Sequence, residues 1–464
     1  MKFIGREREL ESMKRMLSSE GPNVTLVLGR RRVGKSALIA ESLSRCDATS
    51  VYYECKRTTE ANNVESLSEV VSEALGIPGL SFGSIEDAVE FLYRSSKERK
   101  AVLVLDEYPY LRDVSPGLDS VLQRLVDMHA LDSSLSLVLC GSFIDVMRSL
   151  LGAGNPLYGR VDLTVELGPM DYLDAARFYP TFSPADKVRL YSVFGGIPYY
   201  TRLIDPSLSV TGNIMELVTC PGARLENEVE MHLDSEIAKM ENANEVFGAL
   251  AAGYTKYSDI RDQSHVSSGP SLVDTLGKLI KMGLVEKTAP INCADNRRRR
   301  GYRIVDGLTL FHYRYVFRYS SQRSVMAPQT FWERFIADDF DHRFVPLAFE
   351  GICRQYLVRR NLAGKIDPPL ELIGSYSYDD PVAHANGEFD VVAQDAQGYA
   401  FYEAKFRSTP ITRAMVEEEI AQVEATGLAC HRYGFFSCSG FEPDAAQGAH
   451  GRDIELVSIE ELYA

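Results

Sequence analysis

The sequence lacks any apolar stretch long enough to cross a membrane. The longest apolar run beside a predicted strand, AVLVL at Ala101 to Leu105, is far short of the roughly 20 residues that a membrane helix needs. The N-terminal stretch MKFIGREREL becomes charged at once and has neither the apolar segment nor the small-residue cleavage site of a signal peptide. We therefore expect a cytoplasmic protein without a membrane partner.

Metal-binding cysteine patterns and an excess of basic residues are also missing. The eight cysteines include no CxxC pair and no histidine at ligand spacing, which argues against a zinc site and against a disulfide framework. Lys and Arg number 50 against 65 Asp and Glu, so the net charge is -15. This acidity opposes non-specific binding of nucleic acid by the chain as a whole, and any such contact must be local.

The clearest positive signal is a phosphate-binding motif near the N-terminus. The stretch NVTLVLGRRRVGKSALIAESL predicts a strand over Val24 to Leu28, a loop from Gly29 and a helix beginning near Lys35. It fits the pattern GxxxxGK[ST] with the residues Gly29, Gly34, Lys35 and Ser36. Glycine lets backbone N–H groups surround a phosphate, the lysine reaches the β- and γ-phosphates, and the serine hydroxyl ligates Mg²⁺. ATP and Mg²⁺ are therefore the expected cofactors.

Two further predicted strands carry polar residues at their carboxyl ends. KAVLVLDEYPYL is an apolar strand that ends in Asp106 and Glu107, as expected of a buried parallel strand. We expect Asp106 in the Mg²⁺ shell and Glu107 beside the attacking water, which it would polarise; adjacent acids at a helix N-terminus are the alternative. LSLVLCGSF ends at Ser142, which is either a sensor of the γ-phosphate or an ordinary turn residue.

These motifs, in this order, resemble the AAA-like ATPases that are widespread in archaea and also occur in bacteria, relatives of the signal-transduction NTPases. The resemblance extends over FIGREREL, GRRRVGKS, LVLDEYPYL, CGSFIDVM, NPLYGRVDLTVELGPMDYLDAARFYP and FGGIPYY. It implies that Gly5–Glu7 lies near the adenine and that Arg160 contacts the γ-phosphate within or between subunits, unless Arg160 is a surface residue of a helix. The nucleotide contacts implied in addition to the motif residues are Arg6, Arg32, Val33 and Arg160.

The middle of the chain predicts a helical lid followed by a winged helix. Residues 171–240 have a helical pattern that GGIPYY interrupts, and they resemble the lid of AAA-like proteins with Gly196 and Pro198 at its hinge; an ordinary helix–helix turn is the alternative. Residues 241–318 follow the order helix, helix, helix, strand, strand. Winged helices bind DNA or proteins, and both partners stay open. The residues expected to contact DNA phosphates are Lys278, Lys281, Arg297, Arg298, Arg299 and Arg300.

The polar stretch Arg318–Thr330 predicts a linker before a last domain over 330–464. This domain contains two strands joined by a turn, GEFDVVAQDAQGYAFYEAKF, which carry Asp390, Glu403 and Lys405. Asp390 and Glu403 can share Mg²⁺, which stabilises charge developing on a phosphate, and Lys405 can orient or activate the attacking water. A structural salt bridge between Asp390 and Lys405 is the alternative.

This arrangement resembles the restriction-endonuclease-like PD-(D/E)xK fold, a domain that also accompanies the ATPase family above. The resemblance implies Glu350, on the preceding helix, as an auxiliary acid and metal ligand, and Gln422, on the following helix, as a further candidate. Related domains bind DNA without cutting it, so cleavage and binding both stay open. His384 and His431 are isolated and are expected to be structural.

Together these patterns predict an α/β protein of four parts: a P-loop ATPase core with a parallel sheet (1–170), a helical lid (171–240), a winged helix (241–318) and an α/β restriction-endonuclease-like domain (330–464). The resulting hypothesis is an ATP-dependent, Mg²⁺-requiring switch protein whose nucleotide state controls DNA binding or cleavage. Its rivals are a regulatory ATPase that binds nucleic acid without cutting it and a protein-interaction scaffold. A homo-oligomer or a protein partner is compatible with each.

Overall fold

The computed structural model describes residues 3–231, 242–266, 268–380, 385–447 and 452–464. The chain forms two compact units, Met1–Met170 with Ile197–Tyr199, and Asp171–Gly196 with Tyr200–Ala464. Within the described ranges, no helix is long and apolar enough to cross a membrane.

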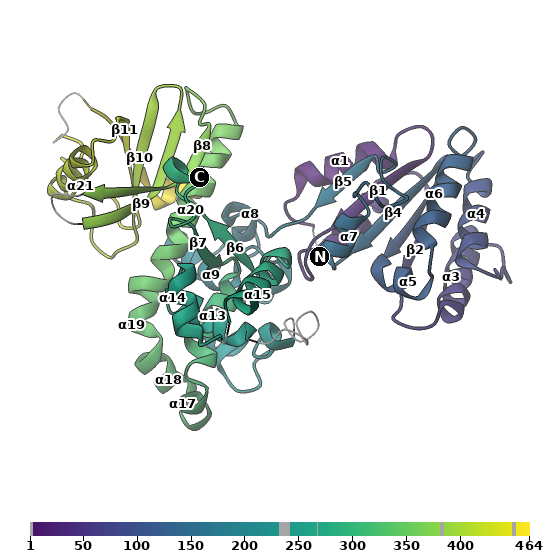
Figure 1. Cartoon of the computed structure of the whole chain (residues 1–464), viewed down its shortest axis with the longest axis horizontal. Coiled ribbons are helices and arrows are strands. Elements are labelled where there is room, and N and C mark those ends of the chain that lie inside the picture. The colour runs from purple at the N-terminus through teal and green to yellow at the C-terminus, as the bar shows by residue number, and fades with distance from the viewer. Residues whose placement is uncertain (1–2, 232–241, 267, 381–384, 448–451) are drawn as a thin grey trace. The chain divides into compact units, whose positions relative to one another are not determined.

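The first unit is built on a five-stranded parallel sheet in the order β2-β3-β4-β1-β5 (Figure 1). Its strands are β1 (Asn23–Leu28), β2 (Thr49–Glu54), β3 (Ala101–Asp106), β4 (Leu135–Gly141) and β5 (Leu163–Glu166). Strands β1, β3 and β4 are buried at every residue, which is why they have continuous rather than alternating apolar sequences. The helices around the sheet are α1 (Glu7–Leu17), α2 (Lys35–Ser44), α3 (Glu60–Leu75), α4 (Ile85–Ser95), α5 (Tyr108–Val114), α6 (Leu118–Met128) and α7 (Ile144–Ser149).

The second unit begins with short helices and continues with three helices and a hairpin. The short helices are α8 (Tyr172–Ala176), α9 (Pro184–Phe194), α10 (Pro198–Thr201), which enters from the first unit, α11 (Val210–Ile214) and the π-helix η1 (Met215–Thr219). The predicted order helix, helix, helix, strand, strand is confirmed by α13 (Ala243–Ala251), α14 (Tyr257–Ser264), α15 (Gly269–Lys281) and the antiparallel strands β6 (Val285–Thr288) and β7 (Gly301–Ile304). A single 3-10 turn, η2 (Ile291–Cys293), lies in the loop between these two strands.

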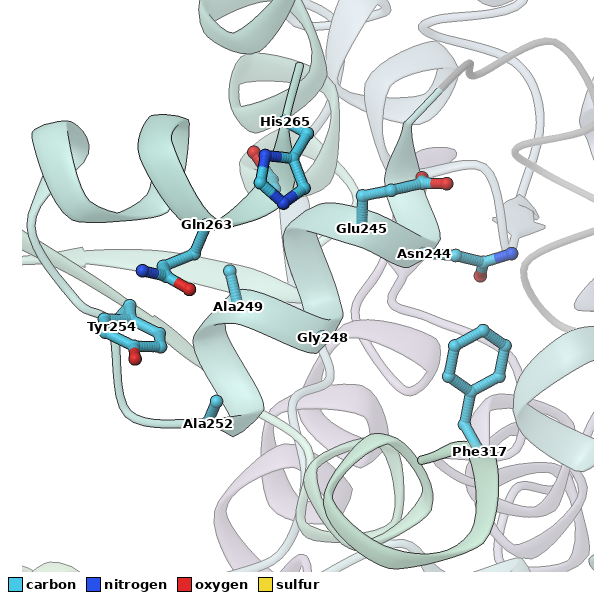
Figure 2. Close-up of a pocket in the computed structure, with 10 residues that line it drawn as sticks. Asn244, Glu245, Gly248, Ala249, Ala252, Tyr254, Gln263, His265 and Phe317 are labelled. Atoms are coloured by element: carbon cyan, nitrogen blue, oxygen red, sulfur yellow. The ribbon is translucent and has the colours of Figure 1, made fainter. Parts of the chain in front are cut away.

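A cavity of about 280 Å³ lies beside α13 and α14 (Figure 2). Small residues of α13, Gly248 and Ala249, form one wall, and the ring of Phe317 lies at one end. Gln263 and His265 supply polar atoms to the lining. None of the site residues predicted from the sequence lines this cavity, so it belongs to neither of the candidate sites described below.

The stretch predicted as a polar linker, Arg318–Thr330, is helical instead. It contains α17 (Ser320–Val325) and the start of α18 (Pro328–Phe335). Most of its side chains are exposed, which explains the polar composition. The half-buried Arg323 nevertheless donates to the carbonyl oxygen of Thr219 (2.6 Å), at the end of η1. This contact fixes the segment against a neighbouring helix, and the linker prediction is wrong.

The chain ends in a five-stranded mixed sheet in the order β12-β11-β10-β9-β8. Its strands are β8 (Leu372–Asp380), β9 (Ala385–Asp395), β10 (Gly398–Lys405), β11 (Cys430–Ser437) and β12 (Asp453–Ser458). Strands β8, β9 and β10 are antiparallel neighbours, whereas β10, β11 and β12 are parallel. The helices from α16 to the end are α16 (Gly307–Phe311), η3 (His312–Phe317), α19 (Ala337–Asp339), η4 (Phe340–Phe344), α20 (Val345–Leu362), α21 (Arg413–Ala425) and α22 (Ile459–Leu462), in addition to α17 and α18.

Successive residues of β10 face different helices, as the two-residue period of a strand requires. Phe401 lies in the apolar cluster that includes Val416 and Ile420 of α21. The next residue, Tyr402, packs against Phe436, which in turn contacts Tyr356 of α20. The sheet is therefore covered on both faces, by α21 on one side and by α20 on the other.

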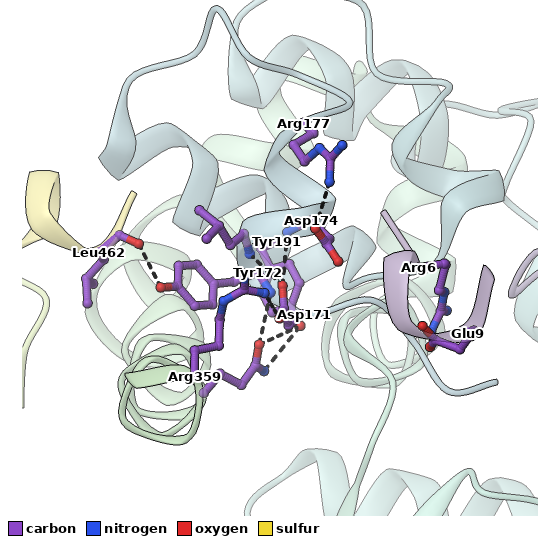
Figure 3. Close-up of polar contacts among 11 residues, drawn as sticks. Arg6, Glu9, Asp171, Tyr172, Asp174, Arg177, Tyr191, Arg359 and Leu462 are labelled. Carbon is purple, nitrogen blue, oxygen red and sulfur yellow. Dashed lines mark hydrogen bonds and ion pairs between the residues drawn. The ribbon is translucent and has the colours of Figure 1, made fainter. Parts of the chain in front are cut away.

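The start of the segment predicted as a lid packs against the C-terminal part of the same unit (Figure 3). Tyr172 donates from its backbone N–H to Gln355 of α20 (2.9 Å) and from its hydroxyl to the carbonyl oxygen of Leu462 (2.7 Å). Asp171 forms an ion pair with Arg359, also on α20. The helices α8 and α20, far apart in sequence, are thus held together within the second unit.

Candidate functional sites

The loop between β1 and α2 surrounds the side chain of Lys35. The Lys35 ammonium is buried and donates to the carbonyl oxygens of Gly29 (2.8 Å) and Arg30 (3.1 Å). It also donates to Ser142 Oγ (2.9 Å). Burial lowers the pKa of Lys35, although Cys140 and nearby acids act in the opposite direction. The strand, the loop and the helix starting at Lys35 all lie where the motif predicts them.

Glycine is required at both ends of this loop. A Cβ at Gly29 would lie 2.3 Å from the carbonyl oxygen of Leu167, so any other residue would displace β5 or the loop. Gly34, which begins α2, has a φ of 96°, in the left-handed region that favours glycine. Between them, Arg32 places its guanidinium 4.1 Å from the ring centroid of Tyr199.

Asp106 receives hydrogen bonds on both carboxylate oxygens. Its Oδ2 accepts from Ser36 Oγ (2.7 Å) and from the Tyr52 hydroxyl, and its Oδ1 accepts from the backbone N–H of Glu107 (2.9 Å). Burial acts to raise the pKa of Asp106, but hydrogen bonds from Cys140, Tyr52 and Ser36 outweigh it and leave that pKa below its usual value. A serine hydroxyl and an ionised carboxylate side by side are oxygen ligands that suit Mg²⁺.

Glu107 adopts an uncommon backbone conformation and pairs with Ser142. Its φ is 52°, in the left-handed region, and such conformations are concentrated at functional sites. Although Glu107 immediately precedes α5, its side chain does not cap that helix. Instead the carboxylate accepts from the Ser142 hydroxyl and from the Ser142 backbone N–H (3.1 Å). Ser142 therefore links the Lys35 ammonium to the Glu107 carboxylate.

Three other predicted nucleotide contacts lie in different surroundings. Arg6 is buried and donates to the carbonyl oxygens of Gly168 and, at 3.5 Å, Val33. Val33 itself is fully buried. Arg160 forms a two-pronged ion pair with Asp127, with both N–O distances at 2.8 Å. The described contacts thus bring Arg6 to the loop that holds Lys35 but do not bring Arg160 there.

The C-terminal sheet joins Glu403 and Lys405 to a residue that the sequence did not suggest. The Lys405 ammonium lies between Glu403 (2.6 Å) and Glu419 of α21 (2.7 Å). Gln422, the residue predicted on this helix, donates its amide to the Tyr378 hydroxyl (2.8 Å) instead. The only sequence signal for Glu419 was its place in the acidic run of the following helix, and the fold decides which acid of the run meets Lys405.

Asp390 sits in a β-bulge. Between two successive paired positions, β9 has two residues, Asp390 and Val391, whereas β8 has only one. Bulges re-aim side chains and are frequent beside active sites. The backbone carbonyl of Asp390 accepts from Arg354 of α20 (2.9 Å), which holds the bulge against the helix that also carries Glu350.

Burial and neighbouring carboxylates raise the pKa values of the acids in this cluster. Burial, with Asp390 and then Glu403 nearby, raises the pKa of Glu350 to about 8. Burial and Glu419 raise the pKa of Glu403 to about 7, and burial also raises that of Asp390. Over the part of the chain that the structure describes, no three acidic, histidine or cysteine side chains are close enough to hold a metal ion. Carboxylate oxygens are ligands of the kind that divalent cations prefer, and a metal ion on Asp390 and Glu403 stays a prediction.

Of the two isolated histidines, one lies among the described residues. His431 pairs with the buried Asp395 (3.0 Å), a structural contact at the hairpin between β9 and β10. His384 lies outside the described residues.

Two family models match separate parts of the chain. Residues 3–204 match the model described as an ATPase domain predominantly from Archaea. Residues 3–204 are therefore an ATPase domain of this family. Residues 312–422 of the ATPase match a second model, described as archaeal and bacterial proteins of unknown function. This second match contains Glu350, Asp390, Glu403, Lys405 and Glu419.

Two proteins of one organism, both named as uncharacterized proteins, are similar to this chain. One protein of Methanocaldococcus jannaschii is 24% identical over 392 residues, which are 84% of each chain. Another from the same organism is 31% identical over 83 residues, 17% of this chain and 80% of that protein. Among solved structures, the Walker-type ATPase of Pyrococcus abyssi matches with a TM-score of 0.50 and 20% identity, over 67% of this chain and 96% of that one. That likeness shows a shared fold.

Tyr52 gives a first test of the nucleotide site. We expect Tyr52→Phe to raise about 10-fold the Mg²⁺ concentration needed for half-maximal nucleotide binding, since a hydrogen bond to a charged group contributes about 1.5–3 kcal/mol and Asp106 would lose one that fixes its carboxylate. The measurement is a Mg²⁺ titration of binding of a fluorescent ATP analogue. Tyr158→Phe, at an exposed position of the same unit, is the control, and an unchanged Mg²⁺ requirement in Tyr52→Phe would contradict the assignment.

Proposed function

We propose that this ATPase is a Mg²⁺-dependent switch that binds and hydrolyses ATP and thereby controls nucleic-acid binding or cleavage by its C-terminal part. The proposal of ATP binding and hydrolysis rests on the contacts from Lys35 through Ser142 to Glu107, beside the Ser36–Asp106 pair. These contacts bring an ammonium, two hydroxyls and two carboxylates together at one edge of a parallel sheet, where such folds bind ligands. They support the roles proposed below.

Each residue of this group has a distinct task in the proposal. Lys35 binds the β- and γ-phosphates. The Glu107 carboxylate orients the attacking water and accepts its proton as a general base. Ser36 and Asp106 hold Mg²⁺, which when bound offsets charge on the phosphates. The residues proposed to contact the nucleotide are Arg6, Gly29, Arg32, Val33, Gly34, Lys35, Ser36, Ser142 and Arg160.

The helix α10 provides a route from the nucleotide site to the rest of the chain. Its residue Tyr199 belongs to the first unit and packs under the guanidinium of Arg32 in the phosphate loop. The next residue, Tyr200, belongs to the second unit and donates to Glu228 (3.1 Å). A change at Arg32 on nucleotide binding would therefore reach the second unit through one peptide bond, which supports the Gly196–Pro198 hinge.

For the C-terminal part we propose a nuclease-like site. Asp390 and Glu403 would hold a divalent cation, with Glu350 as auxiliary acid, and water would attack the phosphorus as the bond to the leaving oxygen breaks. The pKa of Lys405 is raised: burial acts to lower it, but Glu403 and Glu419 outweigh burial. Lys405 is thus an ammonium at neutral pH. It can orient the water or stabilise the phosphate charge, but it cannot take a proton.

A second candidate function is supported by the same geometry. Lys405 is bonded to two carboxylates, and the described acids form no three-ligand metal group. Both features suit a domain that binds nucleic acid or protein without cutting. In this alternative the chain is a regulatory ATPase, and Asp390 and Glu403 balance charge.

Cleavage of DNA by the full chain decides between the two. Plasmid, linear duplex and single-stranded DNA are incubated with ATP and either Mg²⁺ or Mn²⁺, and the products are separated on gels. If the site is a nuclease, Asp390→Ala should lower the cleavage rate at least about 100-fold, since one ligand of a catalytic metal is lost. Glu371→Ala, an exposed acid of the same part, should cut as wild type does. Wild-type protein that cuts none of these substrates rejects the nuclease in favour of the second candidate.

A further inference from the structure

The four consecutive arginines in the loop between β6 and β7 divide into two kinds. Arg297 and Arg298 are exposed, whereas Arg299 and Arg300 are half-buried. The half-buried pair forms hydrogen bonds within the protein. Arg299 donates to Ser377 Oγ of β8 (2.8 Å), and Arg300 donates to a carbonyl oxygen of its own loop. The exposed pair is left for a partner.

The loop is fastened to β8, the edge strand of the C-terminal sheet. Asn292 and Ser377 exchange two hydrogen bonds, from Asn292 Nδ2 to the Ser377 carbonyl oxygen (2.8 Å) and from the Ser377 N–H to Asn292 Oδ1 (3.1 Å). Beside them, a Cβ at Gly374 would lie 2.8 Å from Ile291 Cγ2. Glycine at 374 therefore permits the loop to lie directly on the strand.

The other side of the loop is held by the turn before α14. Lys256 donates to the carbonyl oxygen of Arg299 (2.8 Å), and the N–H of Tyr302 donates to the carbonyl oxygen of Thr255 (2.8 Å). With partners on both sides, the backbone of the loop that carries Arg297 and Arg298 is held in place. A binding surface of this kind loses little conformational entropy on association.

The same hairpin borders the acid cluster. Arg303 on β7 acts electrostatically on two residues of α20: it lowers the pKa of Glu350 and that of Arg354, although burial is the largest influence on both. Arg354 in turn holds the backbone of Asp390. The hairpin and the Asp390–Glu403 cluster are therefore neighbours within the second unit.

We propose that the β6–β7 loop and β8 form one composite surface for the phosphate backbone of duplex nucleic acid. Arg297 and Arg298 contact the phosphates, and the junction of Asn292 with Ser377 fixes them relative to the acid cluster. The inference rests on the nucleic-acid role proposed above. Guanidinium groups bind phosphates two-pronged, and the loop, INCADNRRRRG, has no aromatic residue on which the bases of a single strand could stack. The tyrosines of β8, Tyr376 and Tyr378, already pack against Tyr399 and Phe389. The lack of a stacking ring on the loop favours a duplex over a single strand.

Binding of a labelled 30-base-pair duplex by the full chain, followed by fluorescence anisotropy in EDTA over a range of salt, tests the arginines. We expect the double substitution Arg297→Ala with Arg298→Ala to weaken binding at least about 10-fold and to reduce the slope of log K against log salt by about 2, because each phosphate contact contributes about 0.9. The control, Arg334→Ala with Arg343→Ala, removes the same charge from exposed positions elsewhere in the unit and should bind like wild type.

A second variant tests the junction without changing any charge. Asn292→Ala with Ser377→Ala should weaken duplex binding about 5-fold, with circular dichroism and thermal unfolding used to check that the protein still folds. Any of four results would overturn the composite surface. Two concern the variants: wild-type affinity in this variant, or equal effects of the two arginine pairs. Two concern the ligand: tighter binding of single-stranded DNA than of the duplex, or equal binding of a labelled polyglutamate peptide. Wild-type protein with no affinity for any nucleic acid would overturn the nucleic-acid role itself.

Discussion

Lys35→Ala is expected to abolish nucleotide binding and ATP hydrolysis. The ammonium bonds with two loop carbonyls and Ser142, and in the proposed complex it would bond with phosphates. Each hydrogen bond to a charged group contributes about 1.5–3 kcal/mol. The loss of two such bonds would weaken ATP binding by roughly 100-fold to 10,000-fold. Isothermal titration with a non-hydrolysable ATP analogue measures the affinity, and phosphate release measures hydrolysis.

The controls for this variant separate loss of the site from loss of the fold. Lys14→Ala removes an exposed lysine of α1 in the same unit and should bind nucleotide normally. Thermal unfolding of Lys35→Ala without nucleotide shows whether the loop still folds when its buried cation is removed. A correctly folded Lys35→Ala protein that still binds ATP would show that the phosphate site lies elsewhere.

The nucleotide site shows which structural information is local in the sequence. Strand β1, the loop and α2 were predictable because GxxxxGK[ST] acts through neighbouring residues, and Glu107 and Ser142 were predictable as residues that follow apolar strands. Tyr52 was not predictable. Its hydroxyl reaches Asp106 only because β2 pairs with β3, and no local sequence pattern determines the order of strands in a sheet.

In the C-terminal part, periodicity was again informative and tertiary contacts were not predictable. The two-residue period of a strand separates Glu403 and Lys405 from Tyr402, and Tyr402 packs with Phe436 on the α20 side. The partner Glu419 depends on how α21 lies across the sheet. Composition alone misled at Arg318–Thr330, because a helix exposed on most of its surface is as polar as a linker.

The stability of the second unit is expected to fall as pH rises from about 5.5 to 8.5. The pKa of Glu403 is raised to about 7 and that of Glu350 to about 8, whereas in the unfolded chain both carboxyls titrate near their usual value of about 4.3. Between these values the folded state keeps protons that the unfolded state has released, so the free energy of unfolding decreases with pH. The expected loss is about 5 kcal/mol, of which Glu403 contributes about 2 and Glu350 about 3.

Urea denaturation at each pH measures this loss through Trp332, the only tryptophan of the chain and a buried residue of the second unit. Glu403→Gln should flatten the pH dependence because it removes one of the raised carboxyls, whereas Glu418→Gln, at an exposed position of α21, should leave it unchanged. A stability that is constant or increases over this range would contradict the raised pKa values of Glu350 and Glu403.

A divalent cation should reverse the same pH dependence if Asp390 and Glu403 hold one. Binding requires the ionised carboxylates, so Mn²⁺ should stabilise the second unit little at pH 5.5 and increasingly towards pH 8.5. Asp390→Ala should remove this Mn²⁺ effect while retaining most of the proton effect, because Glu350 and Glu403 remain. A pH-dependent loss that Mn²⁺ does not restore would mean that the acids serve the fold alone, as expected of a domain that binds without cutting.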